Sequence, residues 1–265
     1  MDQQQQAPEH GDFNWYELMT PNPDAAQGFY SRVLGWSFGQ SEAMGRDYRM
    51  IHADAGPVGG VLTLDAGMQQ GGTAPGWVGY VVVNDIGVAQ SVVRDAGGQI
   101  MMDGFEVAGV GSCALAVDPE GVPFYCIEDR SGHVSNAFAR NAPIIGSCAW
   151  NELSAGDPDR QIAFYTGLLG WRQEGEMPMG ELGAYRFLQH GDYAVGAVMP
   201  RSDAFPFTGW VFYFRVADID AGAEAVRAGG GSLVLEPSEI PGGEYALVAR
   251  DPQGALFGLV GQRGQ

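Results

Sequence analysis

The stretch FNWYELMTPNPDAAQGFYSRVLGW (13–36) recurs without a gap as CAWNELSAGDPDRQIAFYTGLLGW (148–171). Trp15 matches Trp150 and Glu17 matches Glu152, each 135 positions further along the chain. Two later blocks repeat with a spacing of 133 positions: WVGYVVVNDI (77–86) with WVFYFRVADI (210–219), and DPEGVPF (118–124) with DPQGALF (251–257). The chain is therefore an internal duplication of a unit of about 115–120 residues, the size of an ordinary domain.

The duplication sets the expected domain organisation. The first module is predicted over 12–129 and the second over 147–262. Residues 1–11 are Gln-rich and polar and are expected to form a disordered tip. Residues 130–146 mix Gly, Pro, Asn and Ser without sustained periodicity, which is typical of a linker.

Within each module the apolar pattern predicts a strand, a helix and then further strands. Residues 14–19 alternate, which places Trp15 and Glu17 on one face of a strand. Pro23 opens an amphipathic helix that ends at Gly35. A second helix is predicted from Ile86 to Ala96, and further strands over 47–52, 58–64, 78–83, 112–117 and 122–127.

Composition excludes several classes of partner. The chain has 32 acidic and 14 basic residues and a formal charge of −18, so nucleic acid and anionic membranes are poor partners. No stretch approaches the roughly 20 apolar residues of a membrane span, and the N-terminus lacks the pattern of a signal peptide. The 3 cysteines are widely spaced and form no C-x-x-C pair, which favours a reduced, cytoplasmic setting.

The ordered set of motifs resembles the vicinal oxygen chelate superfamily, which includes glyoxalase I, extradiol dioxygenases and bleomycin-resistance proteins. The motifs are FY-x₃-LGW after a first strand, V-x-D-I before a helix and D-P-x-G before a last strand, and each occurs twice. The resemblance implies an α+β fold. Two tandem βαβββ modules would form a curved, mixed eight-stranded sheet with helices on its convex side.

The resemblance also implies where a metal ion would be bound. Metal-dependent members place one His or Glu on each of four strands around a divalent ion. Counting from the motifs puts ligand positions on Trp15, Val78 and Tyr125 in the first module and on Trp150, Val211 and Gly258 in the second. None of these side chains is a ligand for zinc, nickel or iron, so neither a metal site nor a cofactor is expected.

The same strand faces predict a small-molecule pocket lined mainly by aromatic rings. The predicted ligand-binding residues are Trp15, Tyr80, Tyr125, Trp150, Tyr213 and Arg215. Glu17 and Glu152 share this face and are the candidate catalytic residues, as general bases. Structural alternatives stay open: Arg215 could pair with Glu152, and the Trp side chains could be ordinary packing.

The leading functional hypothesis is a glyoxalase-like or bleomycin-resistance-like protein that binds a small molecule in an aromatic concave pocket without the usual metal. One alternative is a lyase or dioxygenase type of enzyme, metal-dependent or metal-free, with Glu17 or Glu152 as base. Another is a regulatory protein with a vestigial pocket. A fold of this kind hosts many functions, so the sequence leaves open whether the chain is an enzyme and whether it forms a homodimer.

Overall fold

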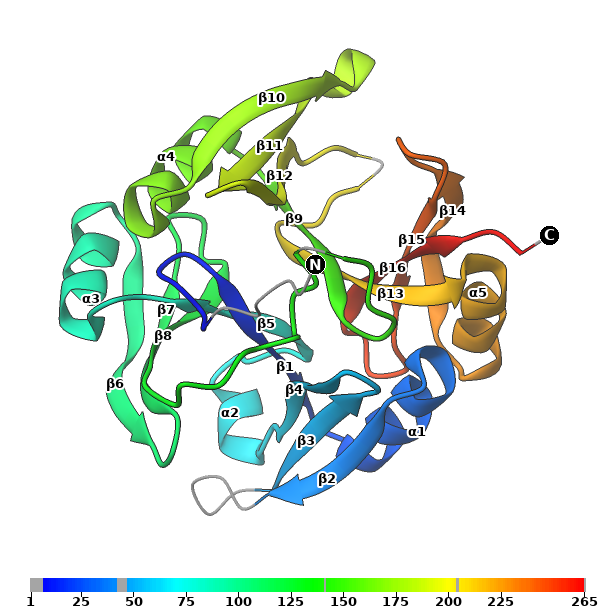
Figure 1. Cartoon of the computed structure of the whole chain (residues 1–265), viewed down its shortest axis with the longest axis horizontal. Coiled ribbons are helices and arrows are strands. Elements are labelled where there is room, and N and C mark those ends of the chain that lie inside the picture. Colours follow the sequence, from blue (N-terminus) through cyan, green and yellow to red (C-terminus); the bar gives the residue numbers. More distant parts are fainter. Residues whose placement is uncertain (1–6, 42–46, 141, 204, 265) are drawn as a thin grey trace, which may run out of the picture. The chain divides into compact units, whose positions relative to one another are not determined.

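The computed structural model describes residues 7–41, 47–140, 142–203 and 205–264 (Figure 1). The elements of the first repeat are β1 (Phe13–Thr20), α1 (Pro23–Leu34), β2 (Ser37–Ser41), β3 (Tyr48–Ala53), β4 (Gly56–Thr63), α2 (Ala66–Gln70), β5 (Gly76–Val82), α3 (Ile86–Asp95), β6 (Gln99–Val107), β7 (Gly111–Val117) and β8 (Pro123–Asp129). Those of the second are β9 (Cys148–Ala155), α4 (Pro158–Leu169), β10 (Arg172–Pro178), the 3-10 turn η1 (Gly180–Leu182), β11 (Ala184–His190), β12 (Tyr193–Pro200), β13 (Gly209–Asp218), α5 (Ile219–Ala228), β14 (Ser232–Glu239), β15 (Tyr245–Arg250) and β16 (Leu256–Gln262).

The strands form two eight-stranded sheets, one for each repeat. Their orders are β2-β3-β4-β1-β5-β8-β7-β6 and β10-β11-β12-β9-β13-β16-β15-β14. Both sheets are mixed: β1 runs parallel to β4 and β5 to β8, whereas hairpins such as β3–β4 are antiparallel. The predicted α+β class and tandem layout are confirmed. Each repeat contains the pattern of a strand, a helix and three further strands twice, and therefore forms an eight-stranded sheet of its own. The sequence had led us to expect a single eight-stranded sheet shared by the two repeats.

The repeated motif starts and ends the first helix of each repeat. The Asn22 side chain accepts a hydrogen bond from the Ala25 backbone N–H, and Gly35 ends α1 in the left-handed conformation with φ of 70°. Arg49 of β3 forms an ion pair with Asp24 in the first turn of α1 at 2.7 Å. The second repeat places Asp157, Gly170, Arg186 and Asp159 in the same roles around α4.

The chain forms two compact units, and each takes one half from each repeat. Unit 1 comprises Gly79–Ser135, Asn151–Trp210 and the N-terminal segment up to Asn14. Unit 2 comprises Trp15–Val78, Asn136–Trp150 and Val211–Gln265. Helices α3 and α4 pack together in unit 1, and α1 and α5 do so in unit 2. The compact units therefore do not coincide with the predicted modules 12–129 and 147–262. Those module boundaries stay a prediction that rests on the sequence duplication.

The expected disordered tip lies only partly within the described residues. Residues 1–6 lie outside them. Gly11 is buried, and its carbonyl accepts a hydrogen bond from Trp171 Nε1 at 2.8 Å. The reciprocal bond runs from Trp36 Nε1 of the first repeat to the Gly146 carbonyl ahead of the second, also at 2.8 Å. The structural repeat therefore extends to residues before Phe13.

A buried Tyr–Asp pair joins the two repeats inside each unit and explains two of the repeated motifs. In unit 2, the Tyr30 hydroxyl donates to Asp251 Oδ2 at 3.2 Å and accepts from Trp77 Nε1 at 2.9 Å. The other oxygen of Asp251 accepts the backbone N–H of Gln253, within its own D-P-x-G turn, and that of Ala255, directly after the turn. Burial, and then the Asp251 charge, raise the pKa of Tyr30 well above its usual value, so the hydroxyl stays protonated. Unit 1 has the same arrangement of Tyr165, Asp118 and Trp210.

The aromatic cores show which face of each sheet is packed. In unit 2, the Tyr16 ring lies 4.9 Å from that of Phe212 and 5.9 Å from that of Phe214. In unit 1, Phe124 contacts Phe164 in the same way at 5.9 Å. Because strand side chains alternate, the neighbours of these residues point to the opposite side. We call that side, which carries Trp15, Glu17, Tyr80, Tyr125, Glu152, Tyr213 and Arg215, the second face.

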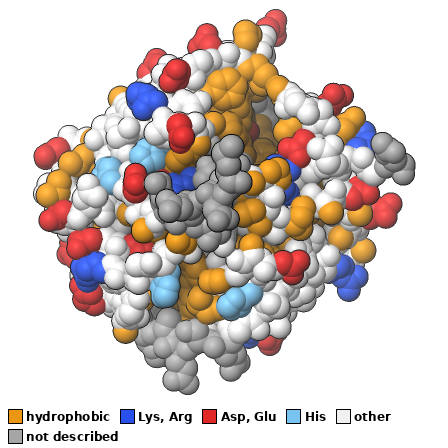
Figure 2. All heavy atoms as spheres, in the orientation of Figure 1, with side chains coloured by type: hydrophobic (Ala, Val, Ile, Leu, Met, Phe, Trp, Pro, Cys, Tyr) orange, Lys and Arg blue, Asp and Glu red, His pale blue; other side chains and the backbone are white. Residues whose placement is uncertain are grey.

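The surface carries its negative charge in many separate places. Acidic side chains appear around the whole face viewed in Figure 2, and basic ones are fewer. The charge is therefore diffuse and does not by itself mark a binding site. Among the described helices, none combines the length and the apolar character that a membrane crossing requires.

Candidate functional site

Four side chains of unit 1 lie in one row across the second face. Tyr80 on β5 is opposite Tyr125 on β8, which is opposite Leu115 on β7, which is opposite Met102 on β6. The two tyrosine rings stack with centroids 4.2 Å apart and planes 15° apart. Both rings are buried, Leu115 is half-buried and Met102 is 44% exposed. The row is an apolar platform with a rigid aromatic end and an accessible end.

The second repeat has the equivalent row in unit 2 but lacks its second aromatic ring. Tyr213 is opposite Gly258, and the row continues through Val248 to Leu235. A Cβ atom at Gly258 would lie 2.3 Å from the Tyr213 ring, so this ring rests directly on the strand backbone. Of the two rows, only the one in the first repeat has a stacked pair of aromatic rings.

The two candidate bases are buried, and strand alternation puts them on the same face as the half-buried Trp15 and Trp150. Glu17 on β1 and Glu152 on β9 are each less than a tenth exposed. The Tyr185 hydroxyl on β11 donates to Glu152 Oε2 at 2.8 Å. The cross-strand neighbours of Glu152 are Ala197 and then Phe187, both apolar. A buried carboxylate thus has a hydroxyl donor, and its neighbours on β12 and β11 are apolar.

The two tryptophans of the predicted pocket have different surroundings. Both are half-buried. Trp15 Nε1 donates to the Tyr48 hydroxyl at 2.9 Å. The Tyr48 ring passes over Gly60, where a Cβ atom would lie 2.0 Å from the hydroxyl oxygen. The carbonyl of Trp150 accepts the Cys148 thiol at 3.3 Å. Trp15 is therefore held in place by a side chain for which the sequence analysis proposed no role.

Arg215 has an ion-pair partner that the sequence did not indicate. Its guanidinium bonds both carboxylate oxygens of Glu244, with Nη2 to Oε2 at 3.2 Å. Glu152 was the candidate partner expected from the sequence, whereas in the structure Arg215 pairs with Glu244. The hydrogen bond from Arg215 lowers the pKa of Glu244, which keeps the pair charged. Glu244 follows the turn Pro-Gly-Gly, and nothing in that pattern links it to a residue about 30 positions earlier.

The residues present do not fit a catalytic metal ion. The six expected ligand positions carry indole, phenol, alkyl or no side chain. Across the described ranges, no group of three His, Cys, Asp or Glu side chains is placed to hold one ion. Burial raises the pKa of the Cys126 and Cys148 thiols to about 12, which disfavours the thiolate that a metal needs.

Comparison with known proteins identifies the family. The model of the Glyoxalase/Bleomycin resistance protein/Dioxygenase superfamily matches residues 12–134 and 144–259. The chain belongs to this superfamily, and the two matched segments correspond to its two repeats.

Several relatives share nearly the full length of the chain. "Putative glyoxylase CFP32" of Mycobacterium tuberculosis is 31% identical over 252 residues, covering 93% of each chain. The anthracycline biosynthesis proteins DauV of Streptomyces sp. (strain C5) and DnrV of Streptomyces peucetius are each 28% identical, covering 93% of this chain and 91% of theirs.

Solved structures show the same fold at lower identity. The Mn(II)-bound glyoxalase from Novosphingobium aromaticivorans has a TM-score of 0.66 at 14% identity, covering 96% of this chain and 83% of that one. The 2,3-dioxygenase LapB from Pseudomonas sp. KL28 has a TM-score of 0.62 at 14% identity, covering 95% and 92%. At this identity the likeness shows the fold alone.

Proposed function

We propose that the chain binds a small planar aromatic molecule on the second face of its first repeat, without a divalent metal ion. The row of Tyr80, Tyr125, Leu115 and Met102 carries the proposal, because its Leu115 and Met102 end is accessible and the buried tyrosine pair supports that end from behind. The stacked tyrosines lose little freedom on binding, since each already rests on the other.

The relatives support an aromatic ligand. DauV and DnrV are named for anthracycline biosynthesis, and anthracyclines are planar polycyclic aromatic compounds. The expected metal positions carry no side chains that coordinate a divalent ion, and this supports small-molecule binding that does not depend on a metal.

The test is a titration of the full-length chain, purified without chelators, with an anthracycline, a naphthoquinone and a non-aromatic ring compound of similar size. We expect saturable binding of the aromatic compounds by calorimetry, unchanged by EDTA, and no stoichiometric metal by mass spectrometry. Met102→Glu should weaken binding at least fivefold by placing a charge on the accessible end of the row. Leu235→Glu is the matched control, because it makes the same change at the equivalent exposed position of the second repeat.

Three results would contradict the proposal. One is equal loss of binding in the two variants, which would remove the link to the first repeat. The second is binding that EDTA abolishes, or a bound metal at one ion per chain. The third is the failure of every aromatic compound to bind, which would favour a regulatory protein with a vestigial pocket.

A catalytic role is the second candidate, and the Glu152–Tyr185 hydrogen bond favours it. A buried carboxylate with one hydroxyl donor is suited to accept a proton from a bound substrate. Any compound that binds should be tested for turnover. If Glu152 is the base, Glu152→Gln should reduce turnover at least 100-fold and change binding less than about threefold. Glu17→Gln tests the equivalent carboxylate of the first repeat, and unchanged turnover in both variants would exclude this mechanism.

A further inference from the structure

The accessible end of the aromatic row lies on β6, an outermost strand of its sheet, which has a bulge at Met101. Ile100 is opposite Ala116 and Met102 is opposite Leu115, whereas Met101 is the extra residue between them and has no cross-strand partner in this ladder. Met102 is therefore part of the row and Met101 is not. Two adjacent methionines thus occupy different positions relative to the proposed ligand.

These two methionines are also the exposed ones. Met101 is 60% exposed and Met102 is 44% exposed. Every other methionine within the described ranges is buried or half-buried, and Met19 and Met199 are only 5% and 8% exposed. Because oxidation of a side chain depends on its accessibility, a dissolved oxidant should react first with the thioethers of Met101 and Met102.

The thiols of the chain are much less accessible to an oxidant. Cys113, Cys126 and Cys148 are each at most 1% exposed. Burial raises the pKa of Cys126 and Cys148 to about 12, and a thiol is far less reactive than a thiolate. A methionine thioether carries no proton, so its oxidation does not require such an ionisation. Among the described sulfur groups, the exposed thioethers are therefore the most open to oxidation.

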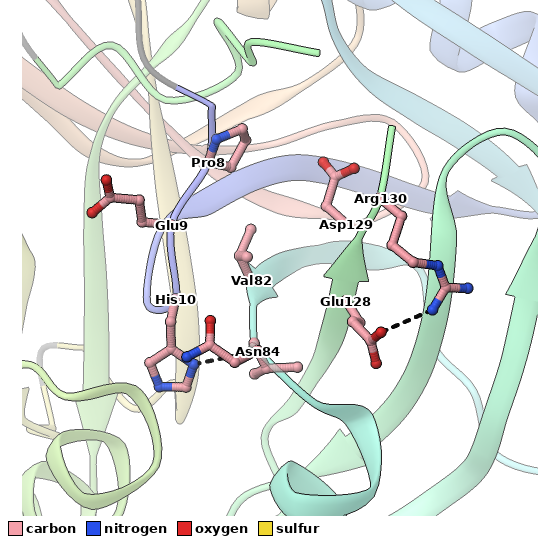
Figure 3. Close-up of a pocket in the computed structure, with 9 residues that line it drawn as sticks. Pro8, Glu9, His10, Val82, Asn84, Glu128, Asp129 and Arg130 are labelled. Carbon is pink, nitrogen blue, oxygen red and sulfur yellow. Dashed lines mark hydrogen bonds and ion pairs between the residues drawn. The ribbon is translucent and has the colours of Figure 1, made fainter. Parts of the chain in front are cut away.

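The pocket near the tyrosine end of the row contains no sulfur atom. Figure 3 shows it between the N-terminal segment and the ends of β5 and β8, just beyond Tyr80 and Tyr125 in those strands. Its lining residues are Pro8, Glu9, His10, Val82, Val83, Asn84, Glu128, Asp129 and Arg130. An oxidant that enters this pocket meets neither a thioether nor a thiol, so the oxidisable end of the row is the one on β6.

The second repeat has the same exposed edge without sulfur. Val234 and Leu235 correspond to Met101 and Met102, 133 positions later, and are 39% and 42% exposed. Strand β14 has the same bulge, since Leu235 is opposite Val248 and Val234 is the extra residue. An apolar side chain at this place therefore need not be methionine. The thioether adds an adaptable shape and the capacity to be oxidised.

We propose that Met102 is a redox modification site, at which oxidation by a peroxide weakens ligand binding to the aromatic row; this inference rests on the proposed function. The sulfur atom attacks one oxygen of hydrogen peroxide, the O–O bond breaks, and an S=O bond and a molecule of water are formed. The sulfur is oxidised and the peroxide is reduced. The sulfoxide is polar, so a ligand that covers it removes water from the S=O group, which disfavours binding.

The first measurement locates the oxidation. The full-length chain is treated with hydrogen peroxide and its peptides are analysed by mass spectrometry over time. We expect sulfoxide at Met101 and Met102 before it appears at Met19 and Met199. Oxidation of Met102 that is no faster than that of Met19 or Met199 would overturn the proposal.

The second measurement links the oxidation to binding. The peroxide is removed with catalase, an anthracycline is titrated by calorimetry, and each chain is compared with its own untreated form. Oxidation should weaken binding about fivefold or more in the wild type and in Met101→Leu. In Met102→Leu, whose row has no thioether, oxidation should change binding by less than about twofold. Circular dichroism checks that the treated chains stay folded, and equal effects of oxidation on the two variants would refute the inference.

A further variant imitates the sulfoxide without an oxidant. Met102→Gln places a polar group at the same distance along the side chain and should weaken binding about fivefold. Leu235→Gln makes a polar change at the equivalent position of the second repeat and should leave binding unchanged. If the untreated wild type binds no aromatic compound, the proposed function fails and this inference fails with it. If the untreated chain binds and sulfoxide at Met102 has no effect, only this inference fails.

Discussion

The buried hydroxyl of Tyr30 allows a quantitative test of how the two repeats hold together. The change Tyr30→Phe keeps the ring contacts and removes one oxygen that has no exposed surface. Its loss leaves two buried groups without their partner: the Trp77 indole N–H, now 2.9 Å away, and Asp251 Oδ2 at 3.2 Å. A buried polar group left unsatisfied costs about 1–3 kcal/mol, so two such groups should lower the free energy of unfolding by about 2–6 kcal/mol.

The assay is equilibrium unfolding in urea, followed by tryptophan fluorescence and by circular dichroism to check that the transition is cooperative. Tyr165→Phe makes the same change in unit 1 and should cost a similar amount. The two clusters share no residue, so the double variant should lose the sum of the two effects. Tyr245→Phe is the control: its half-buried ring stacks under Arg263, a contact that Phe keeps, and the hydrogen bond that it loses is to that 41% exposed guanidinium, so stability should change by about 0.5 kcal/mol or less. A loss below about 0.5 kcal/mol in Tyr30→Phe would refute the reasoning.

Three further predictions follow from the ionisable groups. Burial raises the pKa of Asp118 and Asp251, so the folded chain binds these protons more tightly; their stabilising contribution is complete below about pH 4 and is lost as pH rises through the folded pKa. Unfolding measured between about pH 4 and 7 should therefore show the wild type losing stability relative to Asp251→Asn, and parallel curves would disprove this. The pKa of Glu244 is lowered by Arg215, so its contribution is present above the ordinary glutamate pKa and disappears as pH falls through the folded value; Glu244→Gln should cost about 1 kcal/mol near neutral pH and nothing in acid. Cys126 and Cys148 are buried with thiol pKa values of about 12, so at about pH 8 a thiol reagent should label them only after unfolding, and rapid labelling of the native chain would contradict the packing.

The strands that the sequence predicted are those with a buried face. The intervals 14–19, 47–52, 58–64 and 112–117 all fall on strands of the structure, because half of each strand packs in a core and alternation follows. Strands β2, β6, β10 and β14 were not predicted. They are the outermost strands of the two sheets, and β6, β10 and β14 are largely exposed, so no apolar period marks them.

For the candidate site, too, the sequence predicted some features and not others. Alternation is a local property of the backbone, so parity along single strands predicts which side chains point away from the aromatic core. The partners of those side chains could not be read from the sequence. Tyr185 and Tyr48 repeat at matched positions, and this repetition was the one signal that they contact the first strand of their repeat. The ligand-binding and catalytic roles of Trp15, Glu17, Tyr80, Tyr125, Trp150, Glu152, Tyr213 and Arg215 stay predictions that the experiments above address.

The sequence alone determined the duplication, the superfamily, the acidic character and the lack of suitable metal ligands at the expected positions, since each depends on residue identity at fixed spacing. The tertiary structure decided which half of one repeat packs with which half of the other. It also decided that Tyr30 meets Asp251 and that Arg215 meets Glu244. These contacts join residues that are far apart in the chain. They arise when strand pairing and core burial bring the segments together, and no local pattern of residue types encodes them.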